Sequence, residues 1–517
     1  MNALTVLYGG SLAPQAFAPV LRGESAFNLA LERAAAFPGS KKTVFLTQEG
    51  NIPPIPAEGV SVLQRPSWTV SELLAALSEE AAGFDFAYYA WADTPFLDSA
   101  LAGRIAERHT RFAADYSYAD GWPYGLGPEL ITGAAAGILC KIAGDDGQGP
   151  VKRDSLFAVL QKDINSFDIE TEISPADLRY HRLSLAADSR RNLLLLERFA
   201  GAGCSGAEDA ARIIEERPEC LRTLPAFFPI QVSASCPAKA GACAFCPYPR
   251  IRRPDNGGAF LDPADFEAAL AKIEGFAGDA VIDLSLWGEL SLHPRREALI
   301  QSVLDRPALS LLIETSGYGW AGFGLEQLAE KAAAAQNRLN GLPALSWIVS
   351  LASSDLPAME TEAVLFVKKL ASLFPREAGK DGRVYVETIR TAGAEDAVEQ
   401  FYRAWKAGFP SGGGAPGVII QKYDNFCGLL PQLEAVDLSP VERRPCWHLL
   451  RDFPVLIDGT VPFCREDING SFEKMGNVFR EEPEIIWKRG EALYFSHCRK
   501  EYEEPCKICG EYYTFNF

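Results

Sequence analysis

Apolar and polar residues alternate along residues 1–200 in a pattern that predicts short buried strands separated by helices. Three apolar runs have the length of buried strands: Leu4–Tyr8, Thr43–Thr47 and Phe84–Ala90. Apolar positions at helical spacing run from Ala26 to Phe37, and a further helix carries Glu72 in its first turn, as in a capping box. Such alternation favours a parallel or mixed sheet with helices on both faces.

The pattern becomes more regular after Phe228, where six strand-like runs alternate with five helical segments. The strand-like runs are Ile230–Ser235, Ala280–Leu286, Leu309–Thr315, Ser346–Leu351, Arg383–Ile389 and Gly417–Tyr423. The helical segments are Pro263–Phe276, Arg295–Leu304, Leu325–Leu339, Glu360–Phe374 and Glu395–Ala407. With right-handed connections this order predicts a (β/α)6 partial barrel. In such barrels the chemistry lies at the carboxyl ends of the strands.

Composition and charge argue against a nucleic-acid-binding protein and against a membrane protein. The chain has 517 residues and a formal net charge of −18. An acidic chain disfavours a broad nucleic-acid or anionic-membrane surface. The first residues lack the basic and apolar regions of a signal peptide, and no run approaches the roughly 20 apolar residues of a membrane span. We therefore expect a cytoplasmic α/β protein that binds neither nucleic acid nor a membrane.

The changes of pattern divide the chain into four parts. We expect an α/β domain at 1–200, a linker at 201–226, the partial barrel at 227–432 and a small cysteine-rich module at 433–517. Of the twelve cysteines, three fall within Cys236–Cys246 and five within Cys446–Cys509. Clustered thiols in a chain without a secretory leader indicate metal binding rather than disulfides.

The first cysteine cluster directly follows the first barrel strand. Cys236, Cys243 and Cys246 have the spacing C-x6-C-x2-C. Three thiolates on one loop suit a cubane iron–sulfur cluster in which one iron lacks a protein ligand. An open coordination position is typical of a catalytic metal rather than a structural one. A zinc site completed by a distant histidine, or buried free thiols, are the alternatives.

The segment Cys243-Ala-Phe-Cys-Pro247 resembles the cluster loop of radical S-adenosylmethionine (SAM) enzymes. That family usually has three residues between its first two cysteines, whereas this chain has six. The resemblance implies a [4Fe–4S] cluster on the three cysteines, with Phe245 near the adenine of SAM. It also implies cleavage of SAM to methionine and a 5′-deoxyadenosyl radical, with an electron donor such as flavodoxin or ferredoxin.

Motifs at the ends of the barrel strands extend the resemblance over residues 225–430. Glu289 follows the second strand, where the family has a Gly-Gly-Glu-like motif that meets the amino group of SAM. The third strand ends similarly to the family's Glu-Thr-x-Gly, and the fourth ends in a serine. The resemblance thus implies further SAM-binding residues: Trp287, Gly288, Glu289, Glu314, Thr315, Ser350 and Arg390. The alternatives are a solvated loop acid for Glu289 and a barrel-filling or surface role for Arg390.

The second cysteine cluster resembles the SPASM or twitch module that follows the barrel in many radical SAM enzymes. Cys446 and Cys464 lie in C-x12-G-x4-C, and Cys506 and Cys509 lie in C-x2-C-G. The full SPASM pattern has seven cysteines and this module has five, so the resemblance implies one auxiliary [4Fe–4S] cluster on these four. A four-thiolate zinc site is the alternative. Cys498 is left over, as a buried thiol or a substitute ligand.

Cys427 closely follows the sixth strand, so we expect it to face the mouth of the barrel. A thiol there could donate hydrogen to a substrate radical. Tyr423 and Asp424, at the end of the same strand, could bind substrate or move a proton. The alternative is an ordinary loop thiol on a hydrophilic rim.

Residues 1–200 resemble nucleotidyltransferases with a GT-A-like fold. Asp93 opens a segment similar to the family's Asp-x-Pro-Phe, whose aspartate holds Mg²⁺, and Asp168 or Asp188 is a candidate second ligand. Ala18 stands where the family has its catalytic lysine, and the glycine-rich loop is reduced to two glycines, although phosphate binding needs basic charge and free backbone donors there. We expect a non-catalytic domain that binds a substrate or partner.

The order of these three parts resembles the spiro-SPASM protein family. It implies a radical SAM enzyme with one auxiliary cluster, whose substrate, by resemblance to SPASM proteins, is a peptide or protein side chain. Two alternatives are a nucleotidyltransferase that uses the barrel as an accessory and a non-catalytic iron–sulfur or zinc scaffold.

Overall fold

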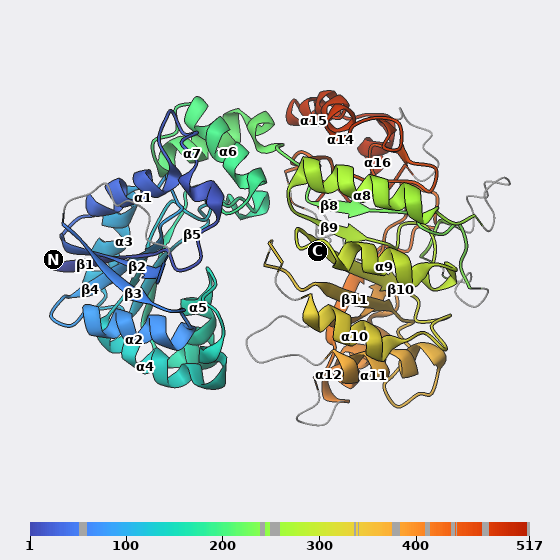
Figure 1. The fold of residues 1–517 in the computed structure, drawn as a ribbon, viewed down its shortest axis with the longest axis horizontal. Helices are drawn as coiled ribbons and strands as arrows, with labels where there is room; N and C mark the ends of the chain where they lie inside the picture. The colour runs from blue at the N-terminus through green and yellow to red at the C-terminus, as the bar shows by residue number, and fades with distance from the viewer. Residues whose placement is uncertain are drawn as a thin grey trace. The chain divides into compact units, whose positions relative to one another are not determined.

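The computed structural model describes most of the chain, in two compact units, Met1–Thr223 and Leu224–Phe517 (Figure 1). The described residues are 1–50, 59–237, 243, 245–248, 259–335, 338–339, 341–374, 383–408, 414–435, 440, 442–467 and 475–513, with the side chains of 145 and 146 excepted. Among them, no helix combines the length and the apolar character that crossing a membrane requires.

The first unit is built on a seven-stranded sheet in the order β3-β2-β1-β4-β6-β5-β7. The strands are β1 (Ala3–Tyr8), β2 (Ser40–Gln48), β3 (Val60–Arg65), β4 (Phe86–Trp91), β5 (Tyr116–Asp120), β6 (Glu129–Ile131) and β7 (Ile169–Ile173). Strands β1 to β4 are mutually parallel, and β6 runs antiparallel to both of its neighbours. The predicted mixed sheet is therefore confirmed.

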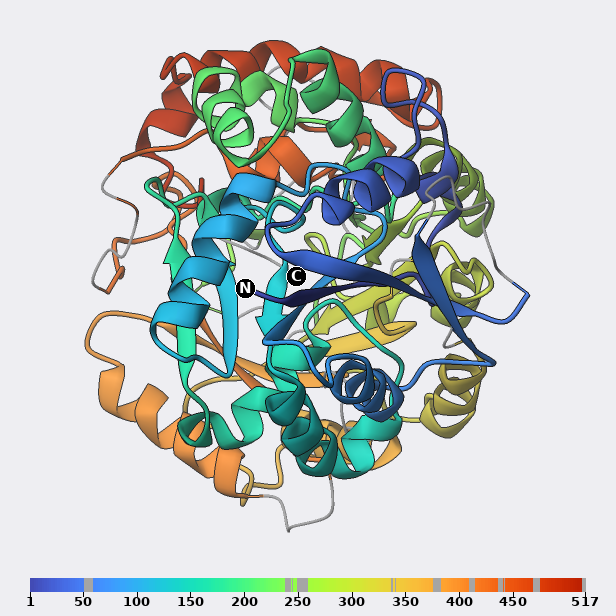
Figure 2. The same cartoon turned by 90° about the vertical axis from the view of Figure 1, so that its left-hand side faces the viewer.

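Helices cover both faces of this sheet (Figure 2). They are α1 (Ala26–Ala35), α2 (Val70–Glu80), α3 (Ser99–Arg111), α4 (Gly133–Ala143), α5 (Ser155–Leu160), α6 (Arg190–Gly201) and α7 (Ala207–Glu216). Alternate side chains of β1, among them Leu4 and Val6, pack against α2 and α4. On the other face Phe27 of α1 packs on Phe45 of β2. The period-two alternation of the strands thus buries both faces.

Local sequence signals set several of these boundaries. Thr69 caps α2, because its hydroxyl accepts from the Glu72 amide at 3.2 Å and its own amide donates to the Glu72 carboxylate at 2.7 Å. Helix α7 is fixed to the first unit, since the Ala207 amide donates to Asp98 at 2.7 Å. Residues 201–223 therefore belong to the first unit, whereas the sequence interpretation placed a linker through 226.

The second unit contains a six-stranded parallel sheet in the order β13-β12-β11-β10-β9-β8, so chain neighbours are sheet neighbours. Its strands are β8 (Phe227–Pro229), β9 (Ala280–Asp283), β10 (Leu309–Thr315), β11 (Leu345–Ser350), β12 (Val384–Arg390) and β13 (Gly417–Lys422). The helices between them are α8 (Pro263–Ala277), α9 (Arg296–Leu304), α10 (Leu325–Ala334), α11 (Glu362–Leu373) and α12 (Glu395–Ala407). These match the predicted alternation of strands and helices.

The first strand of this sheet differs from its prediction. It ends at Pro229, and the apolar run predicted as Ile230–Ser235 continues past the sheet to pair with other segments. The Gln231 amide donates to Val455 at 2.8 Å, and the Ala234 amide donates to Ala259 at 2.9 Å. An extended, apolar run therefore finds its backbone partners in distant parts of the chain.

The two faces of the six-stranded sheet have different coverings. One face packs against α8–α12 in the main core, through side chains such as Ile313 and Trp347. The other face carries a smaller apolar cluster of Phe227, Leu312 and Ile348. Leu312 is the neighbour of Ile313 in sequence and Ile348 is the neighbour of Trp347, so successive side chains point to opposite faces. Below we call this second side the inner face.

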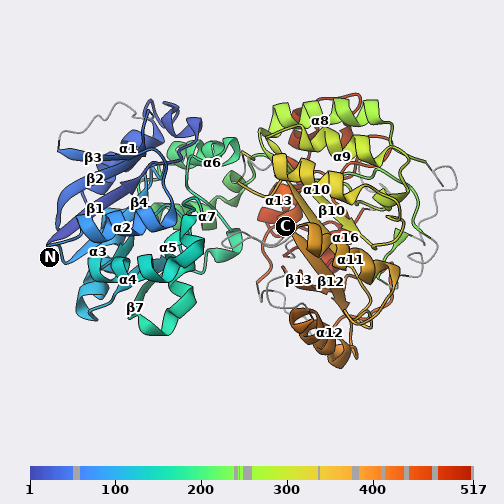
Figure 3. The same cartoon turned by 60° about the horizontal axis from the view of Figure 1, so that its bottom comes forward.

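The C-terminal segment contacts both edge strands of the sheet (Figure 3). It comprises α13 (Trp447–Arg451), β14 (Thr460–Val461), β15 (Gly476–Asn477), α14 (Pro483–Arg489), α15 (Glu491–Cys498) and α16 (Glu504–Ile508). At β8 the Val455 amide donates to Pro229 at 2.8 Å. At β13 the Lys422 ammonium donates to the Gly510 carbonyl at 2.6 Å. The chain turns at Gly459, before Cys464, with a φ of +79°.

Candidate functional site

The first cysteine loop follows the extended segment that leaves β8. Cys236, Cys243 and Cys246 are all partly exposed, and the Cys246 amide donates to the Cys243 carbonyl at 3.2 Å. Burial, with the nearby groups of Cys246, Glu289 and Cys243, raises the pKa of the Cys236 thiol to about 12. Burial and Glu289 likewise raise the pKa of Cys243. The fold thus brings these thiols and Glu289 close together.

Glu289 is a buried carboxylate with 4% exposure, so it is not a solvated loop acid. It accepts hydrogen bonds from the Thr315 hydroxyl at 2.6 Å, the Ser316 amide at 3.0 Å and the Ser316 hydroxyl at 2.8 Å. Burial raises its pKa, and these hydrogen bonds oppose the shift. The backbone of Ser291 forms a further hydrogen bond that also lowers this pKa, so the roughly four acceptor positions of the carboxylate are occupied.

The turn before Glu289 depends on Gly288. A Cβ at this position would lie 1.8 Å from the Ser233 carbonyl oxygen, so no other residue fits between the ends of the first two strands. The neighbouring Trp287 is held at a φ of +49°, and its carbonyl accepts from the Gln231 amide side chain at 2.9 Å. Its ring contacts Phe426 edge-on, with centroids 5.3 Å apart. Gly288 and Trp287 therefore have positioning roles in the described structure.

An open pocket of about 1040 Å³ lies beside the cysteine loop and the carboxyl ends of β10–β13. Four predicted site residues line it, namely Cys243, Phe245, Ser350 and Tyr423. Sequence reasoning missed Ser316, Tyr318, Ser353, Asp355 and Thr388, which also line it. Ser316 directly follows β10, Thr388 lies near the end of β12, and the other three lie in the loops that follow β10 and β11. Their place after the strands was the available sequence signal.

Three predicted cofactor residues lie elsewhere. The Thr315 side chain is buried and hydrogen-bonds Glu289, and its oxygen also accepts from the Trp320 indole at 2.9 Å, so it positions the carboxylate. Arg390 lines a second open pocket, of about 1110 Å³, near β13. Glu314 belongs to a group of acids on the inner face.

This acidic group consists of Asp283 on β9, Glu314 on β10 and Glu387 on β12. Burial, together with Glu314, raises the pKa of Glu387 to about 7, while a hydrogen bond from Ser350 at 2.7 Å and the charge of Arg465 oppose the rise. Arg465 opposes the raised pKa of Asp283 and Glu314 in the same way. It enters from the C-terminal segment and was not predicted, although it directly follows Cys464.

The C-terminal cysteines surround a narrow cavity. All four predicted ligands line it: Cys446, Cys464, Cys506 and Cys509. Burial, followed by the nearby Cys509, raises the pKa of the Cys446 thiol to about 12. Burial, followed by the nearby Cys446, raises the pKa of the Cys506 thiol to about 12 as well. Cys498 packs instead in an adjacent cluster with Cys446 and Tyr494.

Cys427 is the fifth cysteine of this cavity, which corrects the expectation that it faces the barrel mouth. Its thiol donates to the Pro505 carbonyl at 3.4 Å, and a hydrogen bond with it raises the pKa of Cys509. The cause is the backbone after β13, because Phe426 and Cys427 both have left-handed φ values, of 49° and 52°. This strained turn aims the thiol at the C-terminal segment.

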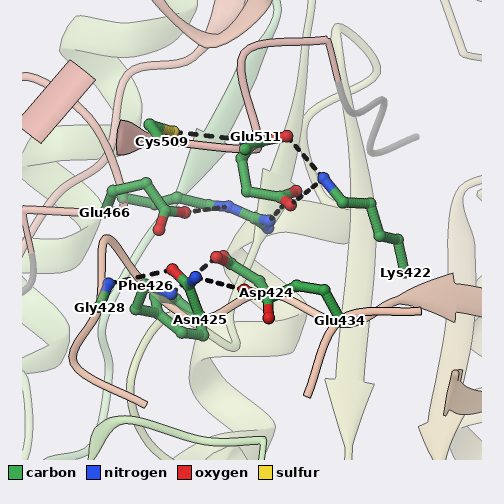
Figure 4. Close-up of polar contacts among 11 residues, drawn as sticks. Lys422, Asp424, Asn425, Phe426, Gly428, Glu434, Glu466, Cys509 and Glu511 are labelled. Atoms are coloured by element: carbon green, nitrogen blue, oxygen red, sulfur yellow. Dashed lines mark hydrogen bonds and ion pairs between the residues drawn. The ribbon is translucent and has the colours of Figure 1, made fainter. Parts of the chain in front are cut away.

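A network of charged side chains lies between this cavity and β13 (Figure 4). Lys422 donates to the buried Glu511 at 2.9 Å. Burial raises the pKa of both Asp424 and Glu466, and the nearby Asp424 raises the pKa of Glu466 further. Tyr423 lies in both open pockets, but its hydroxyl already donates to the Pro431 carbonyl at 2.8 Å.

The two sulfur-donor sets suit iron–sulfur clusters by their chemistry, since such clusters are held by cysteine thiolates. Within the described ranges, no three His, Cys, Asp or Glu side chains are arranged to hold a single metal ion.

In the first unit, Asp93 is buried and paired with Arg153, the shortest contact being 2.6 Å. Asp188 contacts the same guanidinium at 3.0 Å. Asp168 is exposed and its backbone amide donates to Asp115 at 3.0 Å, so it is not part of this group. Ala18 ends a short 3₁₀ turn at Pro14–Phe17.

Comparison with known proteins gives one close relative in sequence. A Treponema pallidum (strain Nichols) protein, described as an uncharacterized protein, is 36% identical over 371 residues, which are 70% of this chain and 98% of the relative. No family model matches the chain.

Several solved structures have a similar fold over about half of this chain. BtrN in complex with AdoMet and 2-DOIA is 17% identical, covering 56% of this chain and 93% of its own, with a TM-score of 0.34. AnSMEcpe with bound AdoMet is 12% identical, covering 55% and 83%, with a TM-score of 0.34. A cytidylyltransferase from Leptospira borgpetersenii is 17% identical, covering 43% and 96%, with a TM-score of 0.36.

Proposed function

This chain belongs to the same family as the Treponema pallidum protein, and we propose that it is a radical SAM enzyme with one auxiliary iron–sulfur cluster. One observation carries the proposal. Cys243 lines an open pocket at the carboxyl edge of a six-stranded parallel sheet, and Cys243, Cys246 and the buried Glu289 lie near enough to Cys236 to raise the pKa of its thiol. In barrel enzymes this edge is where ligands and chemistry lie.

The residues at this edge suit SAM and a cluster with one open iron. Cys236, Cys243 and Cys246 supply three thiolate ligands. Glu289 is oriented by Thr315 and Ser316, and its negative charge suits it to the ammonium group of SAM. We assign the remainder of SAM to the adjoining pocket, with Phe245 and Tyr318 for the adenine and Ser350 for polar contacts.

When bound, a reduced [4Fe–4S] cluster supplies the electron that cleaves SAM into methionine and a 5′-deoxyadenosyl radical, which takes hydrogen from the substrate. The chain's own residues orient the ligand and limit water. Phe245, Trp287, Tyr423 and Phe426 form one apolar cluster next to the pocket. Excluding solvent there protects reactive species from side reactions.

We assign the auxiliary [4Fe–4S] cluster to Cys446, Cys464, Cys506 and Cys509, within a SPASM or twitch module, and the six-stranded sheet to a partial barrel. The spiro-SPASM family fits the order of the parts. The second pocket, which Arg390 and Asp424 line, is the proposed substrate region, for a peptide or protein side chain. The remaining proposals are a flavodoxin-like or ferredoxin-like electron donor and a cytoplasmic location without nucleic-acid or membrane partners.

The test is anaerobic reconstitution, reduction with dithionite and addition of SAM, with 5′-deoxyadenosine measured by mass spectrometry. The iron-loaded protein should form this product. The variant Cys236→Ala/Cys243→Ala/Cys246→Ala should not. The matched control is Cys140→Ala/Cys204→Ala/Cys220→Ala, which removes three thiols from the first unit and should keep the activity. Absence of product from fully loaded wild type rejects the proposal.

Iron counting separates the two clusters. Two cubanes hold about eight irons, so the triple variant of the first loop should retain about four. Loss of nearly all iron would contradict an independent C-terminal cluster, and retention of single zinc ions would favour the zinc alternative.

A further inference from the structure

Arg153 lies between Asp93, which the nucleotidyltransferase resemblance assigns to Mg²⁺, and Asp188, one of the two candidates for the second ligand. Its two terminal nitrogens contact both oxygens of Asp93, at 3.1 and 2.6 Å, and Asp188 accepts at 3.0 Å. Asp93 is 1% exposed, so its carboxylate has no room for a hydrated cation besides the guanidinium. Because a bidentate arginine satisfies a carboxylate more fully than a single point charge, the group is closed.

Aromatic rings hold the guanidinium in place. Its carbon lies 4.5 Å from the centre of the Trp91 ring and 5.0 Å from that of Tyr124, and one nitrogen donates to the Tyr124 hydroxyl at 3.1 Å. Both rings are at least half-buried, so cation–π attraction here is stronger than at an exposed site. The guanidinium of Arg153 is thus held by ion pairs with the carboxylates and by contacts with the two aromatic rings.

The neighbouring strand ends also lack a phosphate cradle. Tyr8 and Trp68 are buried around the two-glycine loop after β1, and a Cβ on Gly10 would lie 2.6 Å from the Tyr8 hydroxyl. The tyrosine ring packs edge-on against Trp91 at 4.8 Å. Rings fill the carboxyl edge of the sheet where doubly wound folds bind nucleotides.

We propose that Arg153 is a built-in replacement for the divalent cation, so that the first unit needs no metal and performs no nucleotidyl transfer. The residues do not fit Mg²⁺ while the guanidinium is present. One positive charge between two carboxylates leaves a net charge of −1, which also disfavours a triphosphate. The two aspartates are retained as partners of Arg153, and they form a latent oxygen-donor site that its removal would open.

Manganese binding to the full chain tests this proposal, since Mn²⁺ prefers oxygen ligands and competes poorly for cysteine thiols. Mn²⁺ is titrated and followed by its paramagnetic resonance signal and by the melting temperature of the first unit. Wild type should show no binding that depends on Asp93. Arg153→Ala should bind Mn²⁺ at least about tenfold more tightly and melt higher with it. Arg153→Ala/Asp93→Asn is the control that should lose the gain.

Arg153→Ala leaves two carboxylates unpaired, and this lowers stability. If it does not fold, Arg153→Gln carries the test, because its amide keeps a hydrogen bond to Asp93 without the charge. A folded variant of either kind that gains no Mn²⁺ overturns the proposal. So does Mn²⁺ binding by wild type that Asp93→Asn abolishes, or pyrophosphate release from a nucleoside triphosphate by wild type.

Discussion

Replacing Glu289 with glutamine should loosen the second unit even when SAM is absent. The carboxylate accepts three hydrogen bonds from residues at the end of β10. Glutamine offers one carbonyl oxygen, and its amide group cannot accept from Ser316. A hydrogen bond to a charged group contributes about 1.5 kcal/mol or more, so losing two of them costs about 3 kcal/mol. The cost of burying the charge, visible in the raised pKa of Glu289, reduces this figure.

Hydrogen exchange followed by mass spectrometry measures the effect at the site itself. A loss of about 3 kcal/mol corresponds to exchange roughly 150-fold faster at the Ser316 amide and the end of β10. Local exchange is the better measurement because a chain of two compact units need not unfold in a single step.

The matched control is Glu360→Gln, an exposed glutamate of the same unit. Exposed substitutions usually change stability by less than about 0.5 kcal/mol. If Glu289→Gln exchanged no faster than this control at Ser316, the hydrogen-bond reasoning would be refuted. Glu289 would then have no positioning role, and only its affinity for SAM would remain to be tested.

Three further outcomes follow from the same contacts. The pKa of Glu387 is about 7 against an ordinary 4.5, so the folded state binds this proton more tightly. Stability of the second unit should therefore fall as pH rises from about 4.5 through 7, and Glu387→Gln should flatten this part of a denaturation profile. Arg465→Gln removes the positive charge that lowers the pKa of Glu387, so the same fall should extend to higher pH; an unchanged profile would contradict the assigned contact. Cys509→Ala should retain the C-terminal iron, because Cys427 lies against Cys509, whereas Cys427→Ala/Cys509→Ala should lose it; iron loss in the single variant would exclude Cys427 as a substitute ligand.

The sequence was most informative where a signal is local. Strand β10 begins and ends at its predicted residues, because its mainly apolar residues are buried along almost its whole length. The cap of α2 follows from Glu72 standing three residues after Thr69. The prediction of a sheet strand at Ile230–Ser235 was wrong, because the backbone of that run pairs with distant residues that include Val455 and Ala259. Apolar pattern alone does not say which segment an extended run will meet.

The site residues show the same contrast between local signals, which the sequence reveals, and distant contacts, which it does not. Glu289 was predicted from its place after the second strand, but its hydrogen bonds to Thr315 and Ser316 join two strands. Arg153 meets Asp93 across 60 positions of sequence, and no motif marks it. Cys427 turns toward the C-terminal segment through left-handed backbone at non-glycine residues, a conformation that residue types there do not predict.

The position of Arg465 explains why the C-terminal segment and the sheet form one compact unit. The residue after Cys464 supplies positive charge to acids on three strands of the inner face, whose burial would otherwise be costly. Val455 and Lys422 tie the same segment to the two edge strands, β8 and β13. The C-terminal cysteines are therefore held by a segment that contacts the edges and the buried acids of the sheet, so the proposed auxiliary cluster would be part of the same compact unit as the sheet rather than an appendage to it.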